Sequence, residues 1–230
     1  MNNANLYNLF LERFPKDPTA LFLDGVDGRR LLYREVPQYT GQMLSLLQQS
    51  GVQKGDRVVV QVEKSIEAVL LYLACLRAGA IYIPLNTAYT PKELGYFLQD
   101  ATPRLFVCAP DRKEALAPVV RAAGVPVVLS LGAGGEGELA EAAATAPASE
   151  QVVEVAADDL AAILYTSGTT GLSKGAMLSH ANLASNAQVL HDYWHWQRDD
   201  VLLHALPIFH VHGLFVALHC ALLGLSLIHL

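Results

Sequence analysis

Along this chain, stretches in which apolar residues recur at helical spacing are separated by short apolar runs typical of strands. This pattern predicts a succession of strands and helices. Apolar residues recur at helical spacing over 33–51, while the run 55–62 is rich in β-branched residues and predicts a buried strand. The stretch 66–78 is apolar almost all round and ends at Gly79, which predicts a fully buried helix. Thr90-Pro-Lys-Glu93 is a capping box with proline in the first turn, so another helix begins there.

The same alternation continues to the end of the chain. It predicts further strands at 80–85, 104–108, 125–130, 159–165 and 201–206, and helices at 112–123, 179–196 and 211–223. We therefore expect an α/β fold with mostly parallel, doubly wound sheets. The segment 132–150 is rich in Gly, Ala and Glu, which indicates a surface loop with room for one weak helix. It divides the chain into a first α/β subdomain (1–131), a linker (132–157) and the start of a second α/β subdomain (158–230).

Composition narrows the class of protein. The 230 residues are 52% hydrophobic and 17% charged, which excludes a disordered tail or a disulfide-stapled mini-protein. The chain has 16 Lys and Arg against 22 Asp and Glu, and its basic residues form no cluster in the sequence. Nucleic acid is therefore not the expected partner. Cys75, Cys108 and Cys220 lie far apart in apolar runs, which predicts reduced thiols in a cytoplasmic protein. The first residues lack the pattern of a signal peptide.

Residues 201–230 contain no Lys, Arg, Asp or Glu. Such a run is long enough for a membrane anchor. Pro207 and Gly213 interrupt it, however, and five histidines in one span are costly in lipid. We therefore expect a buried strand and helix here, and no membrane span.

The strongest chemical signal follows the apolar strand that ends at Tyr165. Glycines there allow successive backbone N–H groups to converge on an anion, hydroxyl groups add further donors, and Lys174 adds a positive charge. The spacing does not fit the Walker A pattern, and the alternative is a polar turn with an incidental lysine. We predict a polyphosphate site formed by Thr166, Ser167, Gly168, Thr169, Thr170, Gly171 and Lys174.

A second glycine pattern, at 132–137, fits G-x-G-x-x-G after a strand, with Glu154 further on. This pattern is typical of dinucleotide-binding folds. Glu138 and Glu141 follow it directly, and their charge repels a pyrophosphate from the next helix. We therefore interpret the pattern as a glycine-rich loop.

A third feature, at 206–213, lies where a strand ends and a helix begins, which is where ligands bind in open α/β sheets. His210 and His212 resemble a metal pair, but no acidic or cysteine ligand is nearby, so no metal ligand is assigned. We predict a substrate-pocket role for His210. His212 and His219 are interpreted as core histidines.

Several of these stretches together resemble the adenylate-forming (acyl-activating) enzymes. The loop 166–174 is similar to their phosphate-loop signature, and three stretches match the family in order: Leu76-Arg-Ala-Gly-Ala-Ile-Tyr-Ile-Pro-Leu, Ser179-His-Ala-Asn-Leu and Leu206-Pro-Ile-Phe-His-Val-His-Gly. Within the family the chain resembles malonyl-CoA synthetases, through Glu63-Lys-Ser, Pro84-Leu-Asn-Thr-Ala-Tyr-Thr and His204-Ala-Leu-Pro-Ile-Phe-His. The likeness extends over 6–223.

The resemblance implies a two-step ligase reaction on a small carboxylic acid, with ATP and CoA as the other partners. The acid attacks the α-phosphate of ATP in the presence of Mg²⁺, which gives an acyl-adenylate and pyrophosphate, and the CoA thiol then displaces AMP. The phosphate loop is implied to hold the β- and γ-phosphates. Lys174 and His210 are the implied catalytic residues, the first at the leaving pyrophosphate and the second beside the reacting carboxylate.

The chain departs from the family by being shorter. It lacks the Tyr-Gly-x-Thr-Glu motif with its Mg²⁺ glutamate, the ribose-binding aspartate and the C-terminal domain with its lysine, and 224–230 lose the family pattern. We expect an N-terminal fragment that is inactive by itself. The alternatives are a ligase for fatty or aryl acids, a non-catalytic nucleotide-binding module and a dinucleotide oxidoreductase.

Overall fold

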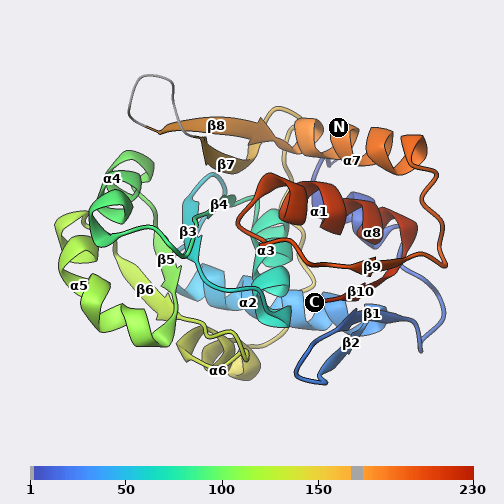
Figure 1. Cartoon of the computed structure of the whole chain (residues 1–230), viewed down its shortest axis with the longest axis horizontal. Coiled ribbons are helices and arrows are strands. Elements are labelled where there is room, and N and C mark those ends of the chain that lie inside the picture. Colours follow the sequence, from blue (N-terminus) through green and yellow to red (C-terminus); the bar gives the residue numbers. More distant parts are fainter. Residues whose placement is uncertain (1–2, 167–172) are drawn as a thin grey trace.

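The computed structural model describes residues 3–166 and 173–230 (Figure 1). Its strands are β1 (Leu21–Asp24), β2 (Arg30–Leu32), β3 (Arg57–Gln61), β4 (Ile81–Pro84), β5 (Leu105–Cys108), β6 (Val127–Ser130), β7 (Leu160–Thr166), β8 (Lys174–Ser179), β9 (Val201–Leu203) and β10 (Leu227–His229). Its α-helices are α1 (Leu6–Leu11), α2 (Val36–Gln49), α3 (Ile66–Ala78), α4 (Pro91–Ala101), α5 (Lys113–Ala122), α6 (Glu138–Thr145), α7 (His180–Tyr193) and α8 (Leu218–Gly224). The short helices η1 (Tyr33–Glu35) and η2 (Pro110–Arg112) are 3-10, and η3 (His212–Ala217) is π-helical.

These strands form two sheets. The larger has the order β6-β5-β3-β4-β7-β8, and its neighbours are parallel except for the antiparallel pair β7–β8. The smaller has the order β2-β1-β10-β9, in which only β1–β2 is antiparallel. The predicted α/β class with mostly parallel sheets is confirmed.

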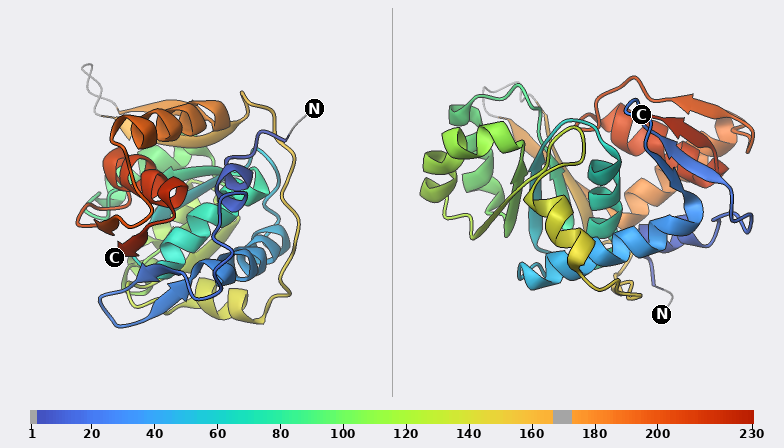
Figure 2. Two further views of the ribbon diagram at one scale, coloured as in Figure 1. Left: turned by 90° about the vertical axis from the view of Figure 1, so that its right-hand side faces the viewer. Right: turned by 90° about the horizontal axis from the view of Figure 1, so that it is seen from below.

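Helices cover both faces of the larger sheet, and α3 is the most central of them. Figure 2 shows α4 and α5 (green) on one side of this sheet and α3 (teal) on the other. The Ser65 side chain accepts from the Ala68 N–H to begin α3, and Gly79 ends it with a φ of 63°. Tyr72 of α3 packs against Tyr82 of β4 and donates or accepts a 2.7 Å hydrogen bond with His219 of α8. Because α3 lies between the larger sheet and α8, it is apolar all round, as predicted.

The α-helix α1 and the strands β1, β2, β8 and β10 were not predicted. The segment expected as a loop with room for a weak helix contains α6. β7 and β8 complete the sheet built from β3 to β6, and β1 pairs with β10, so both sheets draw strands from each side of residues 132–157. The division of the chain at that segment stays a prediction.

The uncharged run 201–230 folds into β9, η3, α8 and β10. Leu218 and Leu222 of α8 are fully buried. β10 lies between β1 and β9, so the edges of the smaller sheet are β2 and β9, and the last strand is an inner one. Within the part of the chain that the structure describes, no helix combines the length and apolar character that crossing a bilayer needs.

Candidate functional site

The predicted polyphosphate site is located by the strands β7 and β8. Thr166 at the end of β7 is the register partner of Lys174 at the start of β8, and both residues are exposed. Because β7 runs parallel to β4, Thr166 lies at the carboxyl edge of the larger sheet, where ligands bind in α/β proteins. The other assigned residues, Ser167, Gly168, Thr169, Thr170 and Gly171, lie outside the described residues.

Helix α4 is hydrogen-bonded to the end of the β7–β8 pair that carries Thr166 and Lys174. The Tyr96 hydroxyl donates to the backbone oxygen of Ser173 at 2.7 Å, and the Tyr165 hydroxyl donates to Asp100 at 2.6 Å. Burial and the hydrogen bond to Asp100 raise the pKa of Tyr165, so the phenol stays protonated and keeps donating. These anchors were not predicted. Tyr165 directly precedes the hydroxyl-rich stretch, but nothing in the sequence pairs it with α4.

Gly175, next to Lys174 on β8, is a position where the structure requires a small residue. A Cβ there would lie 2.8 Å from the Cγ2 atom of Ile163 on the paired strand. The glycine therefore lets β7 and β8 approach closely directly beside Lys174.

The segment 204–213, which follows β9 and ends in the first residues of η3, carries His210. Figure 1 shows it in red, below α7. His204 and Ile208 are each 3% exposed, whereas His210 and His212 are exposed and stack with ring centroids 5.2 Å apart. The expectation that His212 is a core histidine is therefore wrong, because the turn at Pro207 directs residues 210–212 outward, where the His210 N–H donates to the Pro207 oxygen at 3.2 Å.

The structure brings some of the assigned residues together and not others. Thr166 and Lys174 are paired on the larger sheet, while His210 follows a strand of the smaller sheet. Across residues 3–166 and 173–230, His210 makes no hydrogen bond or ion pair with either of them. The roles of all the assigned residues stay predictions.

The buried histidines are structural. His219 is fully buried, stacks on Tyr72 and hydrogen-bonds it, and burial lowers its pKa to about 3. His180 is fully buried and accepts from the Leu6 N–H at 3.1 Å, and burial lowers its pKa to about 4. Both imidazoles are therefore neutral near pH 7.

The described ranges hold neither a preformed cluster of metal ligands nor a thiol with a lowered pKa. They hold no group of three or more His, Cys, Asp or Glu side chains placed to bind a metal. Mg²⁺ usually binds through one or two carboxylates and the phosphates of a substrate, so the Mg²⁺ that the resemblance implies stays a prediction. Cys75, Cys108 and Cys220 are buried free thiols, and burial raises the pKa of each. Raised thiol pKa values are typical of inert core cysteines.

The glycine-rich loop 132–137 leads into α6, but its helix terminus is occupied. The Glu138 N–H donates to the Ser130 hydroxyl, and the Glu138 carboxylate accepts from the Ser130 N–H, both at 3.2 Å. Lys113 also pairs with this carboxylate. Protein groups thus fill the position that a dinucleotide pyrophosphate takes in a Rossmann fold.

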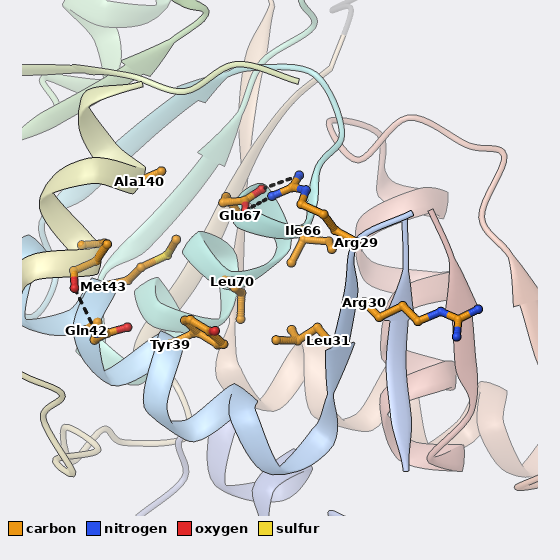
Figure 3. A pocket seen from close by; sticks show the side chains of 12 residues that line it. Arg29, Arg30, Leu31, Tyr39, Gln42, Met43, Ile66, Glu67, Leu70 and Ala140 are labelled. Carbon is orange, nitrogen blue, oxygen red and sulfur yellow. Dashed lines mark hydrogen bonds and ion pairs between the residues drawn. The ribbon is translucent and has the colours of Figure 1, made fainter. Parts of the chain in front are cut away.

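Two larger cavities lie elsewhere on the surface. One of about 480 Å³ opens at the carboxyl ends of β3, β4, β5 and β6, where Arg112 donates to the backbone oxygens of Thr87 and Tyr89. The other, of about 430 Å³, lies between β2, α2, α3 and α6 (Figure 3). Its lining is mostly apolar, and Arg29 forms an ion pair with Glu67 at its rim (Figure 3). Of the assigned residues that the structure describes, Thr166, Lys174 and His210, none lines either cavity.

Comparisons with known proteins show the family and the fold of the chain. The profile described as "AMP-binding enzyme" matches residues 10–230. A crystal structure of ATP-bound MatB from Rhodopseudomonas palustris is 48% identical, with a TM-score of 0.94, and the match covers 100% of this chain and 45% of that one. This near-complete structural match includes both sheets.

Two curated relatives are more distant in sequence. The mitochondrial malonate–CoA ligase ACSF3 of Mus musculus is 36% identical over 73% of this chain, and 4-coumarate–CoA ligase 5 of Oryza sativa subsp. japonica is 34% identical over 88%. The chain spans only 28% and 38% of the length of these two relatives. A profile match over nearly all of its residues nevertheless places the chain in the AMP-binding enzyme family.

Proposed function

We propose that this chain is the ATP- and acid-binding part of an acid–CoA ligase, and that the acid is malonate or methylmalonate. The observation that carries the proposal is the Thr166–Lys174 pair at the carboxyl edge of the larger sheet. The identity of 48% with an ATP-bound structure over the whole chain supports nucleotide binding. The malonate–CoA ligase among the relatives supports the choice of acid.

In this proposal the residues of the chain bind and orient two substrates. Lys174 supplies a positive charge beside the β- and γ-phosphates and stabilises the charge that develops on the leaving pyrophosphate. The hydroxyls of Thr166 and its neighbours in the sequence donate hydrogen bonds to the same groups. His210 lies beside the carboxylate that attacks the α-phosphate, and CoA thiol receives the acyl group in the second step.

A ligase for fatty or aryl acids is the second candidate, and the 4-coumarate–CoA ligase among the relatives favours it. The two candidates differ in the pocket they need. A second carboxylate requires a cation and hydrogen bonds, whereas an acyl chain or ring requires an apolar pocket.

The test is an acid panel with ATP and CoA. In the complete protein, malonate or methylmalonate is expected to give the highest kcat/KM for acyl-CoA formation, ahead of acetate, octanoate and 4-coumarate. A preference for octanoate or 4-coumarate contradicts the acid and keeps the ligase class. Nucleotide binding without pyrophosphate release on any acid indicates a non-catalytic module. Residues 1–230 alone are expected to form no acyl-CoA.

A further inference from the structure

Lys64 connects the two sheets at the segment that carries His210. Lys64 lies in the connection between β3 and α3, and its ammonium donates a hydrogen bond to the backbone oxygen of His204. β3 belongs to the larger sheet, whereas His204 directly follows β9 of the smaller one. One side chain therefore joins the carboxyl ends of strands from different sheets.

A hydrogen bond joins the two ends of segment 204–213, whose first residue Lys64 contacts. The His204 Nε2–H donates to the Gly213 oxygen at 2.9 Å, which fixes the tautomer of the imidazole. Burial lowers the pKa of His204, so the ring is neutral. A Cβ at Gly213 would lie 2.3 Å from the Pro207 oxygen, so only glycine fits this turn. Segment 204–213 is thus a tight loop whose first residue is held from outside by Lys64.

The environment of Lys64 indicates that holding this loop is its role. In the ranges 3–166 and 173–230 no carboxylate forms an ion pair with it. Burial lowers its pKa, so part of the ammonium's hydration is already lost. A hydrogen bond from a charged donor is stronger than one between neutral groups, and here a backbone oxygen receives it.

We propose that Lys64 is a positioning residue for acid binding. The proposal rests on the function proposed above, because the role of His210 beside the acid comes from it. With the Lys64 contact in place, the loop that presents His210 is ordered before the substrate arrives. Without the contact, binding of the acid must also order the loop, and this loss of conformational entropy lowers the affinity for the acid. The affinity for ATP and the rate of the chemical step are not expected to change.

The test compares two substitutions in the complete protein. Lys64→Met keeps most of the aliphatic stem and removes the donor, and it is expected to raise the KM for the acid roughly 5- to 20-fold, with kcat and the KM for ATP changed less than about twofold. Lys64→Arg keeps a charged donor and is expected to restore most of the lost affinity.

Arg29→Met is the matched control. Arg29, in the turn between β1 and β2, pairs with Glu67 in the first turn of α3 (Figure 3), so it also joins the smaller sheet to α3. Among the described residues, its side chain bonds only to Asp27 and Glu67, and to nothing in segment 204–213. This variant is expected to lower thermal stability and to leave the KM for the acid unchanged. An equal rise of that KM in Arg29→Met and Lys64→Met shows a general weakening and overturns the proposal.

Hydrogen–deuterium exchange separates this proposal from the proposed function. The amides of His210 and Leu214 donate to the oxygens of Pro207 and His210, and Lys64→Met is expected to speed their exchange more than Arg29→Met does. If no acid is activated, the proposed function fails, while faster exchange still supports Lys64 as the residue that holds the loop. Unchanged exchange, or faster exchange with an unaltered KM for the acid in an active enzyme, overturns the positioning role.

Discussion

Thr166 and Lys174 face each other as register partners at the end of the antiparallel β7–β8 ladder. The neighbouring Ser173 oxygen is held by Tyr96, and Tyr165 is held by Asp100, so both strands are fixed to α4 at this end. The backbone around Lys174 is therefore held in place, which suits the phosphate-binding role proposed for this lysine.

The first prediction concerns Lys174. In the complete protein, Lys174→Ala is expected to slow adenylation far more than thioester formation, because pyrophosphate is present only in the first half-reaction. Loss of one charge-assisted contact to the leaving group raises that barrier by about 2–4 kcal/mol. Pre-steady-state measurement of both half-reactions checks this. Lys92→Ala, at an exposed position of α4, serves as the control and is expected to change neither rate. Equal slowing of both steps contradicts the assignment.

Local signals made much of the fold predictable. The bounds of α3 follow from Ser65 as a side-chain cap and from Gly79 in the left-handed region. α4 begins where Thr90 and Glu93 form their capping box, with the Thr90 N–H donating to Glu93 at 2.8 Å. Signals of this kind act within one turn of a helix, so a single sequence reveals them.

Elements that depend on distant partners were not predictable. The sequence of β8, Lys-Gly-Ala-Met-Leu-Ser, shows no alternation of apolar and polar residues, and its first four positions are exposed. It is a strand because β7 pairs with it. The contact between Lys64 and His204 joins residues 140 positions apart. Both residues lie in stretches that carry the family resemblance, but nothing in the sequence pairs one with the other. The candidate site was therefore predicted as separate motifs, while the contacts that anchor them came from the structure.

Arg77 is expected to be the most important buried cation for stability. It is 3% exposed, and its guanidinium donates to the backbone oxygens of Gln151, Pro37 and Ser149 at 2.6–2.8 Å. Arg77→Met leaves these oxygens without that donor and is expected to lower the free energy of unfolding by about 3 kcal/mol or more. Urea denaturation measures the loss, with Arg121→Met at an exposed position of α5 as the control.

A smaller loss for Arg77→Lys supports the same reasoning, since lysine keeps the charge but presents fewer directed donors. If Arg77→Met and Arg121→Met prove equally stable, the guanidinium contacts contribute little to stability.

Stability is expected to fall in mild acid because of His180. Burial lowers its folded pKa from 6.5 to about 4, with Asp159 opposing and Lys54 reinforcing the shift. Between those values the unfolded chain binds a proton that the folded chain excludes, so the free energy of unfolding decreases as pH falls from 6.5 towards 4. Between pH 7 and pH 5 this one group accounts for about 2 kcal/mol.

His180→Gln removes the titrating group and keeps a side-chain oxygen that can accept from the Leu6 N–H. Urea denaturation at pH 7 and pH 5 is expected to show a loss about 2 kcal/mol smaller in this variant than in the unaltered chain. An identical loss in both proteins means that His180 does not drive the pH dependence. His219, which is buried like His180, contributes equally to both and cancels in the comparison.

The last prediction concerns the exposed apolar residues at the edge of the smaller sheet. Val201 and Leu203 of β9 are 54% and 76% exposed, and Leu206 just beyond is 47% exposed. β9 is an edge strand with no charged side chain, a combination that favours pairing with another chain. Residues 1–230 are therefore expected to self-associate in a concentration-dependent way on size-exclusion chromatography. Leu203→Glu introduces a charge on this edge and is expected to shift the population towards monomer. Val26→Glu is the control, because Val26 is 98% exposed in the β1–β2 turn. It adds the same charge away from this edge and is expected to have little effect on self-association. Equal responses to the two substitutions point to net charge as the cause and contradict a role for β9, since only Leu203 lies on the open edge.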